Sequence, residues 1–172
     1  MEFLDLLKKR HSVKAFNDQK VSKKDLDKIV EAGLYSPSGM NKQAVKFLVV
    51  TDKKLIDRIG KINASIMGVD KDPFYNAQAL IVVFGNKNAS TYVEDASLAL
   101  GNMLNEAFSI GVDSCWVHRA KETFLTEEGL TIKKTYGIDD DYIGVGNCIL
   151  GFRAKEFGVK PRVANRVIYV EE

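Results

Sequence analysis

The sequence has 172 residues, the length of a single domain, and its 45% hydrophobic and 28% charged residues are typical of a globular protein. The formal net charge of +2 is too small for the clustered basic surface of a nucleic-acid-binding protein. The longest uninterrupted apolar run, ALIVVF at 79–84, is far shorter than the ~20 residues that a membrane-spanning helix needs. We therefore expect one domain over residues 1–172 that binds neither nucleic acid nor a membrane.

The N-terminal part of the chain predicts two helices, a loop and a strand. Residues 2–9 have the apolar spacing of a short amphipathic helix. Ser22 and Asp25 have the spacing of a capping box, with a shorter acid than usual, so a second helix is expected to begin after Ser22. The Ser, Pro, Gly and Asn residues of YSPSGMNKQ (35–43) are typical of a loop, and VKFLVV (45–50) predicts the first strand.

The rest of the chain alternates apolar strands with helices. A helix is expected after the cap residue Asp52, a long and mostly buried one over 92–109, and another after Thr126. Strands are predicted over 79–85, 114–118 and 142–150, and RVIYV in the C-terminal tail is strand-like again. The first of these strands is apolar throughout, which indicates cover on both faces. Because strands alternate with helical cover, the order favours an α+β layered domain over a sandwich or a bundle.

The stretch RHSVKAF (10–16) directly follows the first helix. Cations at a helix C-terminus interact favourably with the negative end of the helix dipole, which accounts for the two lysines that end this helix. It does not account for Ser12 and Lys14, which would share one side of an extended segment with Arg10. A guanidinium, an ammonium and a hydroxyl together suit a phosphate. Phosphate binding is therefore one interpretation, and a plain helix end is the other.

A second pair of cations lies near the other end of the chain, in KPR (160–162). Lys160 and Arg162 fall on the same side of an extended segment, and Pro161 stiffens their spacing. A solvated tail is the alternative interpretation. The two basic stretches could close on one dianion, although the spacing leaves open whether they meet.

Other nucleotide and metal motifs are absent from the sequence. GVGNCILG (144–151) lies inside an apolar strand, and its third glycine comes too late for GxGxxG, so Rossmann-type binding is excluded. Cys115, Cys148 and two histidines offer no metal-ligand spacing, so no metal site is expected and both cysteines are interpreted as buried apolar residues. Acidic residues within MEFLDLLKKR argue against a secretory leader, and a cytoplasmic location is expected.

Two further segments admit a structural or a functional interpretation. The loop SPSGMNKQ (36–43) offers hydroxyl and amide groups and a glycine that permits close approach of the backbone, so it is either a connector or a binding loop. DSCWVH (113–118) holds the single tryptophan, which is either a core residue or a neighbour of a cofactor.

Taken together and in this order, these stretches resemble the flavin-dependent nitroreductase family. RHSVKAF is similar to the family's opening signature of arginine, any residue, serine, valine, a basic residue and an aromatic. The loop at 36–43 resembles its second signature, and LGF…KPR (150–162) its closing one. In two places the chain departs from the family: Ala44 and Val45 stand where the family often has Pro-Trp, and Arg153 replaces the proline of LGYP. Both departures bear on substrate choice more than on the cofactor.

The resemblance implies a nitroreductase-like layered fold, with a central, mostly antiparallel sheet flanked by helices, in an intertwined homodimer. It also implies two FMN sites at the subunit interface, with residues carried over position by position. Those from one subunit are Arg10, His11, Ser12 and Lys14, then the backbone around Cys115, Trp116, Val117 and His118 at the flavin's N5 and O4 edge, and Lys160 and Arg162 at the phosphate; those from the other subunit are Pro37, Ser38, Gly39 and Asn41.

The chemistry that the resemblance implies is carried by the flavin, with no catalytic side chain. NAD(P)H, as a transient donor, would deliver hydride to the flavin N5, and a nitroaromatic, a quinone or a similar small acceptor would then take its place in a ping-pong cycle. Lys14 would stabilise the negative charge of the reduced flavin. The alternatives are other flavin chemistry on the same scaffold, namely reductive dehalogenation or a biosynthetic oxidation, and a flavin-binding protein without turnover.

Overall fold

A four-stranded antiparallel sheet with the strand order β1-β2-β4-β3 forms the centre of the computed structural model, which describes residues 2–171. The two ends of the predicted domain, residues 1 and 172, lie outside the described residues. The strands are β1 (Val45–Val50), β2 (Ala79–Asn86), β3 (Asp113–Val117) and β4 (Tyr142–Gly151). The predicted α+β class and the antiparallel sheet are both confirmed.

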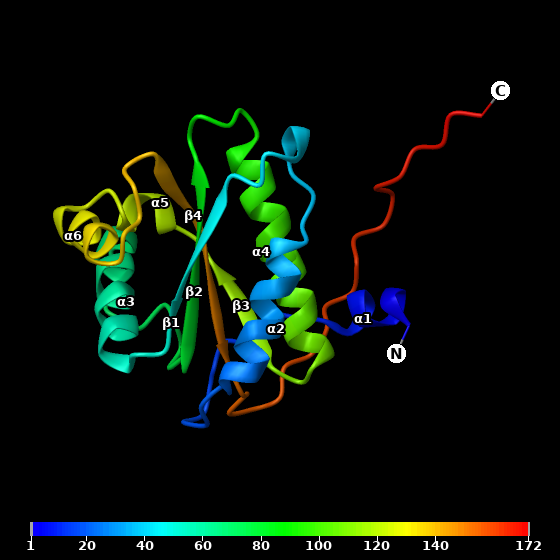
Figure 1. Cartoon of the computed structure of the whole chain (residues 1–172). Helices are drawn as coiled ribbons and strands as arrows, with labels where there is room; N and C mark the ends of the chain where they lie inside the picture. The colour runs from blue at the N-terminus through cyan, green and yellow to red at the C-terminus, as the bar shows by residue number, and fades with distance from the viewer. Residues whose placement is uncertain (1, 172) are drawn as a thin grey trace.

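Helices cover both faces of this sheet, as Figure 1 shows. One face carries α2 (Lys23–Leu34) and α4 (Tyr92–Ser109), and the other carries α3 (Lys53–Met67), α5 (Ala120–Thr123) and α6 (Glu127–Thr135). A short helix α1 (Phe3–Lys9) and a 3₁₀ turn η1 (Gly39–Asn41) complete the set. Between residues 2 and 171, no helix is both long and apolar enough to cross a bilayer.

The strand β2 is the centre of two hydrophobic cores. Leu80, Val82 and Phe84 point to the side of α3, whereas Ile81 and Val83 point to the side of α2 and α4. Each of these side chains is fully buried. Since burying such a side chain stabilises a fold by about 1.5–3 kcal/mol, β2 holds the two layers together. The predicted cover of this strand on both faces is confirmed.

Three predicted caps begin the helices that hold these layers. The Ser22 hydroxyl accepts from the Asp25 N–H, the Asp52 carboxylate from the Lys54 N–H, and the Thr126 hydroxyl from the Gly129 N–H. Each bond satisfies a backbone donor that the first helical turn leaves free. The helix starts are therefore fixed by local chemistry.

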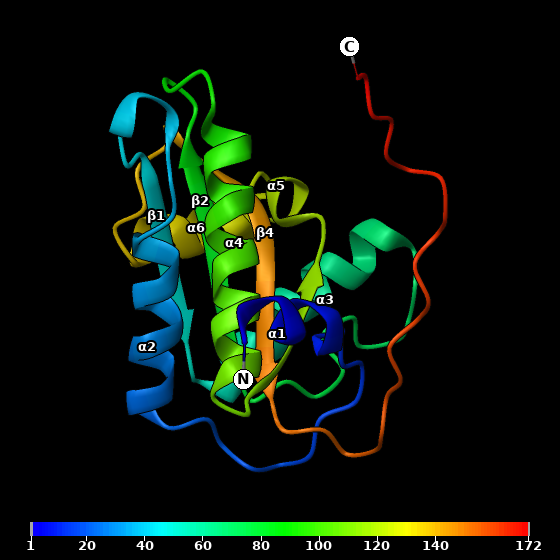
Figure 2. The ribbon, with the colours of Figure 1, turned by 90° about the vertical axis from the view of Figure 1, so that its right-hand side faces the viewer.

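The strand-like prediction for the tail is wrong. After β4 the chain forms no further β-ladder within the described residues, and Val167, Ile168, Tyr169 and Val170 are between 67% and 95% exposed. Figures 1 and 2 show the tail running away from the sheet and its helices. β-Branched residues favour an extended backbone, but a strand also needs a neighbouring strand to pair with. Within residues 2–171, no strand pairs with the tail.

Candidate functional site

A pocket of about 520 Å³ lies where the segment after α1 meets the segment after β4. Its lining contains four cationic side chains from opposite ends of the chain, namely Arg10, Lys14, Lys160 and Arg162. The remaining lining residues are His11, Ser12, Cys115, Trp116, Phe157, Gly158 and Val159. The two basic stretches that the sequence left unconnected therefore meet in space.

The first basic stretch is oriented by one buried apolar residue. The α1 helix ends where the Arg10 N–H donates to the Leu6 carbonyl, and the chain then becomes extended. Val13, which lies between Ser12 and Lys14, is only 1% exposed. Because side chains alternate along an extended backbone, Ser12 and Lys14 are turned towards the pocket. Alternation thus produces the cationic side that the spacing predicts.

The second basic stretch is held through Arg153, at the start of the segment that follows β4. Its backbone N–H donates to the Asp113 carboxylate at 2.8 Å, and its Nη2 donates to the same carboxylate at 2.6 Å. The side chain of Asp113 is only 7% exposed. The Asp113 carboxylate raises the pKa of the Arg153 guanidinium. A proline at this position could make neither bond, because it lacks both the N–H and the charge.

Backbone pairing connects the two basic stretches directly. Phe16 and Arg153 form an antiparallel bridge. On either side of it, the Asn17 N–H donates to the Phe152 carbonyl at 2.9 Å, and the Ala154 N–H donates to the Ala15 carbonyl at 2.9 Å. The segments that lead into the two halves of the cationic pocket are therefore fixed relative to each other.

His11 brings a polar atom without a protein partner to this pocket. Its Nδ1 lies 2.9 Å from the Lys9 carbonyl, which can only accept, so Nδ1 carries the proton. Its ring contacts Phe108 edge-on. The Nε2 atom is buried and has no hydrogen-bond partner among residues 2–171. Buried polar atoms are usually paired, so this atom points to a ligand group beside it.

Cys115 lies beside Ser12 at the wall of the pocket and is only 4% exposed. Burial raises the pKa of its thiol, and the hydrogen bond with Ser12 and the charges of Lys14 and Arg10 oppose that rise only in part. A thiol with a raised pKa stays protonated at neutral pH and is a weak nucleophile. Cys115 is therefore a packing residue of the wall, as the sequence indicates.

The adjacent residues of β3 are placed differently from one another. Trp116 lines the pocket and is 37% exposed, and a Cβ on Gly146 of β4 would come within 2.5 Å of the Trp116 Nε1. Glycine at 146 therefore lets the indole lie against the sheet. Val117 is buried and His118 is exposed, and neither lines the pocket.

Two buried asparagines converge on the backbone where β3 ends. The Nδ2 of Asn63, from α3, donates to the His118 carbonyl at 2.8 Å, and the Nδ2 of Asn147, from β4, donates to the same oxygen at 3.3 Å. Neither asparagine was singled out from the sequence. The available signal was an amide within an apolar strand, or on an apolar helix face, where an uncharged polar group needs a partner.

The remaining predicted residues lie in the loop around η1. The Gly39 N–H donates to the buried Asp95 carboxylate in the first turn of α4, and the Gln43 N–H donates to the Ser38 hydroxyl. A Cβ on Gly39 would lie 2.2 Å from the Thr91 Oγ1, so only glycine permits this approach. Pro37 and Ser38 line a small pocket of about 80 Å³.

Within one chain this loop and the cationic pocket are far apart. The loop is bound to Asp95 at the start of α4, whereas His11 contacts Phe108 at the end of the same helix. A rise of 1.5 Å per residue separates these two positions by roughly 20 Å. Figure 1 shows η1 and α1 at opposite ends of α4. The structure thus brings Arg10 and Arg162 together but leaves Ser38 and Asn41 elsewhere.

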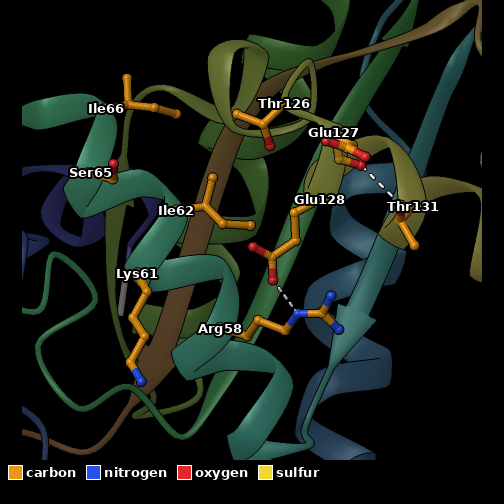
Figure 3. A pocket seen from close by; sticks show the side chains of 9 residues that line it. All are labelled: Arg58, Lys61, Ile62, Ser65, Ile66, Thr126, Glu127, Glu128 and Thr131. Carbon is orange, nitrogen blue, oxygen red and sulfur yellow. Dashed lines mark hydrogen bonds and ion pairs between the residues drawn. The ribbon is translucent and has the colours of Figure 1, made fainter.

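Another pocket, of about 640 Å³, lies between α3 and α6 and contains none of the predicted residues (Figure 3). The Arg58 guanidinium in its wall pairs with Glu128, and the Thr131 hydroxyl donates to the Glu127 carbonyl. Lys61 is the remaining cation of the lining. Since its charges are mixed and partly paired, it lacks the concentration of positive charge that distinguishes the first pocket.

Comparison with known proteins identifies the class to which this fold and site belong. The model of the nitroreductase family matches residues 7–152, so the chain belongs to the nitroreductase family. An Archaeoglobus fulgidus protein, provisionally named an NADH dehydrogenase/NAD(P)H nitroreductase, is 28% identical over 161 residues, which cover 90% of this chain and 87% of that protein.

Solved structures share the fold over nearly the whole chain. A nitroreductase with bound FMN from Bacteroides fragilis superposes with a TM-score of 0.91 at 25% identity, covering 99% of this chain and 100% of that chain. An iodotyrosine deiodinase bound to FMN and 3-iodo-L-tyrosine has a TM-score of 0.81 at 23% identity, with 99% and 100% covered. The second likeness shows the fold alone.

Proposed function

We propose that this chain is an FMN-dependent oxidoreductase that takes hydride from NAD(P)H and passes it to a small acceptor such as a nitroaromatic or a quinone. The observation that carries the proposal is the meeting of Arg10 and Lys14 with Lys160 and Arg162 in one pocket. Membership of the nitroreductase family and the FMN bound to the Bacteroides fragilis structure support it.

The donors of the pocket fit the phosphate of a mononucleotide. Two guanidinium groups, two ammonium groups and the Ser12 hydroxyl supply hydrogen bonds and positive charge for a dianion. The Nε2 of His11 has no partner among residues 2–171, so it can form a hydrogen bond with another group of the ligand. Each charge-assisted hydrogen bond contributes about 1.5–3 kcal/mol to binding, so the cluster is sufficient to anchor the phosphate end.

The rest of the mechanism concerns how side chains orient the cofactor. FMN, when bound, supplies the hydride-accepting and hydride-donating chemistry. Lys14 holds a positive charge beside it and stabilises negative charge that grows on reduction. Trp116, partly exposed on β3, forms a wall of the same pocket. With Cys115 protonated, the site contains no strong protein nucleophile, and none is needed.

A second copy of the chain completes the site in this proposal. The 37–41 loop lies roughly 20 Å from the cationic pocket along α4 of its own chain, so in a homodimer it would serve the pocket of the partner. Phe3 and Leu4 on α1 are 69% and 59% exposed, and the tail residues Ile168 and Val170 are almost fully exposed. Such apolar surface favours burial against a partner.

The test of the proposal is FMN titration of the purified protein, followed by anaerobic addition of NADH or NADPH. We expect saturable binding with quenching of the flavin fluorescence, and bleaching of the flavin absorption by the reduced nicotinamide. Arg162→Ala is expected to raise the FMN dissociation constant by about 10- to 100-fold, because it removes charge-assisted bonds to the phosphate. Arg166→Ala, a matched change in the exposed tail outside the pocket, is expected to leave that constant unchanged.

Equal losses in the two arginine variants would contradict the assignment of the pocket. Bound flavin that neither NADH nor NADPH bleaches would instead favour a flavin-binding protein without turnover. The acceptor is decided by comparing the rates of a nitroarene, a quinone and a halogenated phenol. The halogenated phenol is included because the same scaffold binds 3-iodo-L-tyrosine in the deiodinase.

A further inference from the structure

We propose that Asn63 and Asn147 are positioning residues that aim the backbone N–H of Arg119 at the flavin's N5 and O4 edge. The inference rests on the proposed function, together with the resemblance, which implies that the backbone at the end of β3 faces that edge. It gives a role to two side chains that do not line the cationic pocket.

Both amides are wholly buried and directed at one oxygen. Asn63 and Asn147 are each 0% exposed. Their Nδ2 atoms lie 2.8 Å and 3.3 Å from the His118 carbonyl oxygen, and Asn147 also donates to the Val117 carbonyl at 3.2 Å. Since a carbonyl can only accept, the NH₂ side of each amide must face it, and the orientation of both side chains is fixed.

These contacts leave part of each amide unsatisfied. The Oδ1 atoms of Asn63 and Asn147 have no hydrogen-bond partner among residues 2–171. A buried polar atom without a partner costs free energy, whereas an aliphatic side chain of similar volume in either place would avoid that cost. The hydrogen bonds that the two amides donate to the His118 and Val117 carbonyls offset this cost and fix the backbone at the end of β3.

What they hold is the peptide that joins His118 to Arg119. No cis peptide bond is present in the described residues, so this unit is trans, and its C=O and N–H point in opposite directions. Because the two amides bind the carbonyl, the Arg119 N–H points the other way, and no backbone carbonyl within residues 2–171 accepts from it. Arg119 has a φ of +70°, an uncommon value for a residue with a side chain.

Two donors on one carbonyl also strengthen the donor at the other end of the peptide. Hydrogen bonds in a chain polarise one another, so the Arg119 N–H becomes a stronger donor. A fixed donor at the O4 edge stabilises the electron-rich reduced ring more than the oxidised ring. Removing Asn63 or Asn147 is therefore expected to weaken the binding of reduced FMN more than that of oxidised FMN.

The experiment measures the midpoint potential of bound FMN in Asn63→Leu and Asn147→Leu, with Asn88→Leu as the control. Asn88 donates to Asp141 on the surface, away from β3. We expect each buried variant to lose about tenfold in its affinity for reduced FMN relative to oxidised FMN, which lowers the potential by ~30 mV for a two-electron couple. The control is expected to keep the wild-type potential.

Three outcomes separate this inference from the proposed function. A wild-type protein that binds no FMN overturns both. A wild-type protein that binds FMN, with buried variants that retain its potential, overturns only the positioning role. If the leucine variants do not fold, the amide resonance of Arg119 in the wild-type protein decides: a large shift on FMN addition supports the inference, and an unchanged resonance overturns it.

Discussion

Cys115 and Cys148 show how the burial of single residues makes the stability of the fold depend on pH. Both thiols are buried, and burial raises the pKa of each. The folded state therefore keeps its thiol protons at a pH where the unfolded chain loses them. The neutral thiols contribute fully to the free energy of unfolding below about pH 8.5, the ordinary pKa of cysteine. This contribution is lost as the pH rises towards the raised pKa of the folded state.

We accordingly predict that Cys148→Ala flattens the alkaline loss of stability. Urea unfolding at pH 7 and pH 9.5 should show that the free energy of unfolding falls by about 1 kcal/mol more in the wild-type protein than in the variant. The comparison uses the change with pH in each protein, so the cost of the smaller side chain cancels. Parallel losses in the two proteins would show that Cys148 does not keep its proton in the fold.

At the scale of residues, the sequence could predict those members of the cationic pocket that are grouped by local spacing. Arg10, Ser12 and Lys14 alternate within a few positions, so their common side follows from extended backbone alone. Asn63 and Asn147 could not be predicted, because their shared target is the His118 carbonyl, and a backbone atom leaves no trace in the residue pattern.

At the scale of elements, the segment after β4 depends on an ion pair with the start of β3. The Asp113 side chain is 7% exposed and that of Arg153 is 32% exposed, whereas Glu156, the other partner of Arg153, is 89% exposed. A pair with one buried partner contributes more than an exposed pair, because loss of the arginine's partner leaves charge without compensation in a partly desolvated place.

We predict that Asp113→Asn lowers the free energy of unfolding by about 1–3 kcal/mol, while Glu156→Gln changes it by less than about 0.5 kcal/mol. Asp113→Asn should also weaken FMN binding, because the segment that carries Lys160 and Arg162 loses its attachment. Urea unfolding and FMN titration measure the two effects. Equal behaviour of the two variants would show that Arg153 does not anchor this segment.

The elements themselves were predictable where caps and periodicity act within one turn or one strand. The helices after Ser22, Asp52 and Thr126 begin where the cap residues indicate. α5 was missed, because a helix of four residues is too short to show a period. The tail was assigned wrongly, because strand propensity says nothing about whether a partner edge is available.

At the scale of the whole molecule, α4 separates the two halves of the proposed site. The cationic pocket lies at its C-terminal end, and the loop with Ser38 and Asn41 lies at its N-terminal end. The sequence could predict both halves but not the distance between them, since that distance depends on how α1 and η1 pack against one helix. The separation is the physical reason to expect that two chains make one site.

Complementation between two defective variants tests this claim most directly. Arg10→Ala/Arg162→Ala removes two cations of the cationic half, and Asn41→Trp is chosen to block the proposed loop half with a bulky side chain. Each variant alone is expected to bind little FMN. After unfolding and refolding together in equal amounts, half of the dimers should be mixed and each should hold one intact site, so about one quarter of the sites should bind FMN. A mixture that binds no more FMN than its separate components would contradict a site shared between two chains.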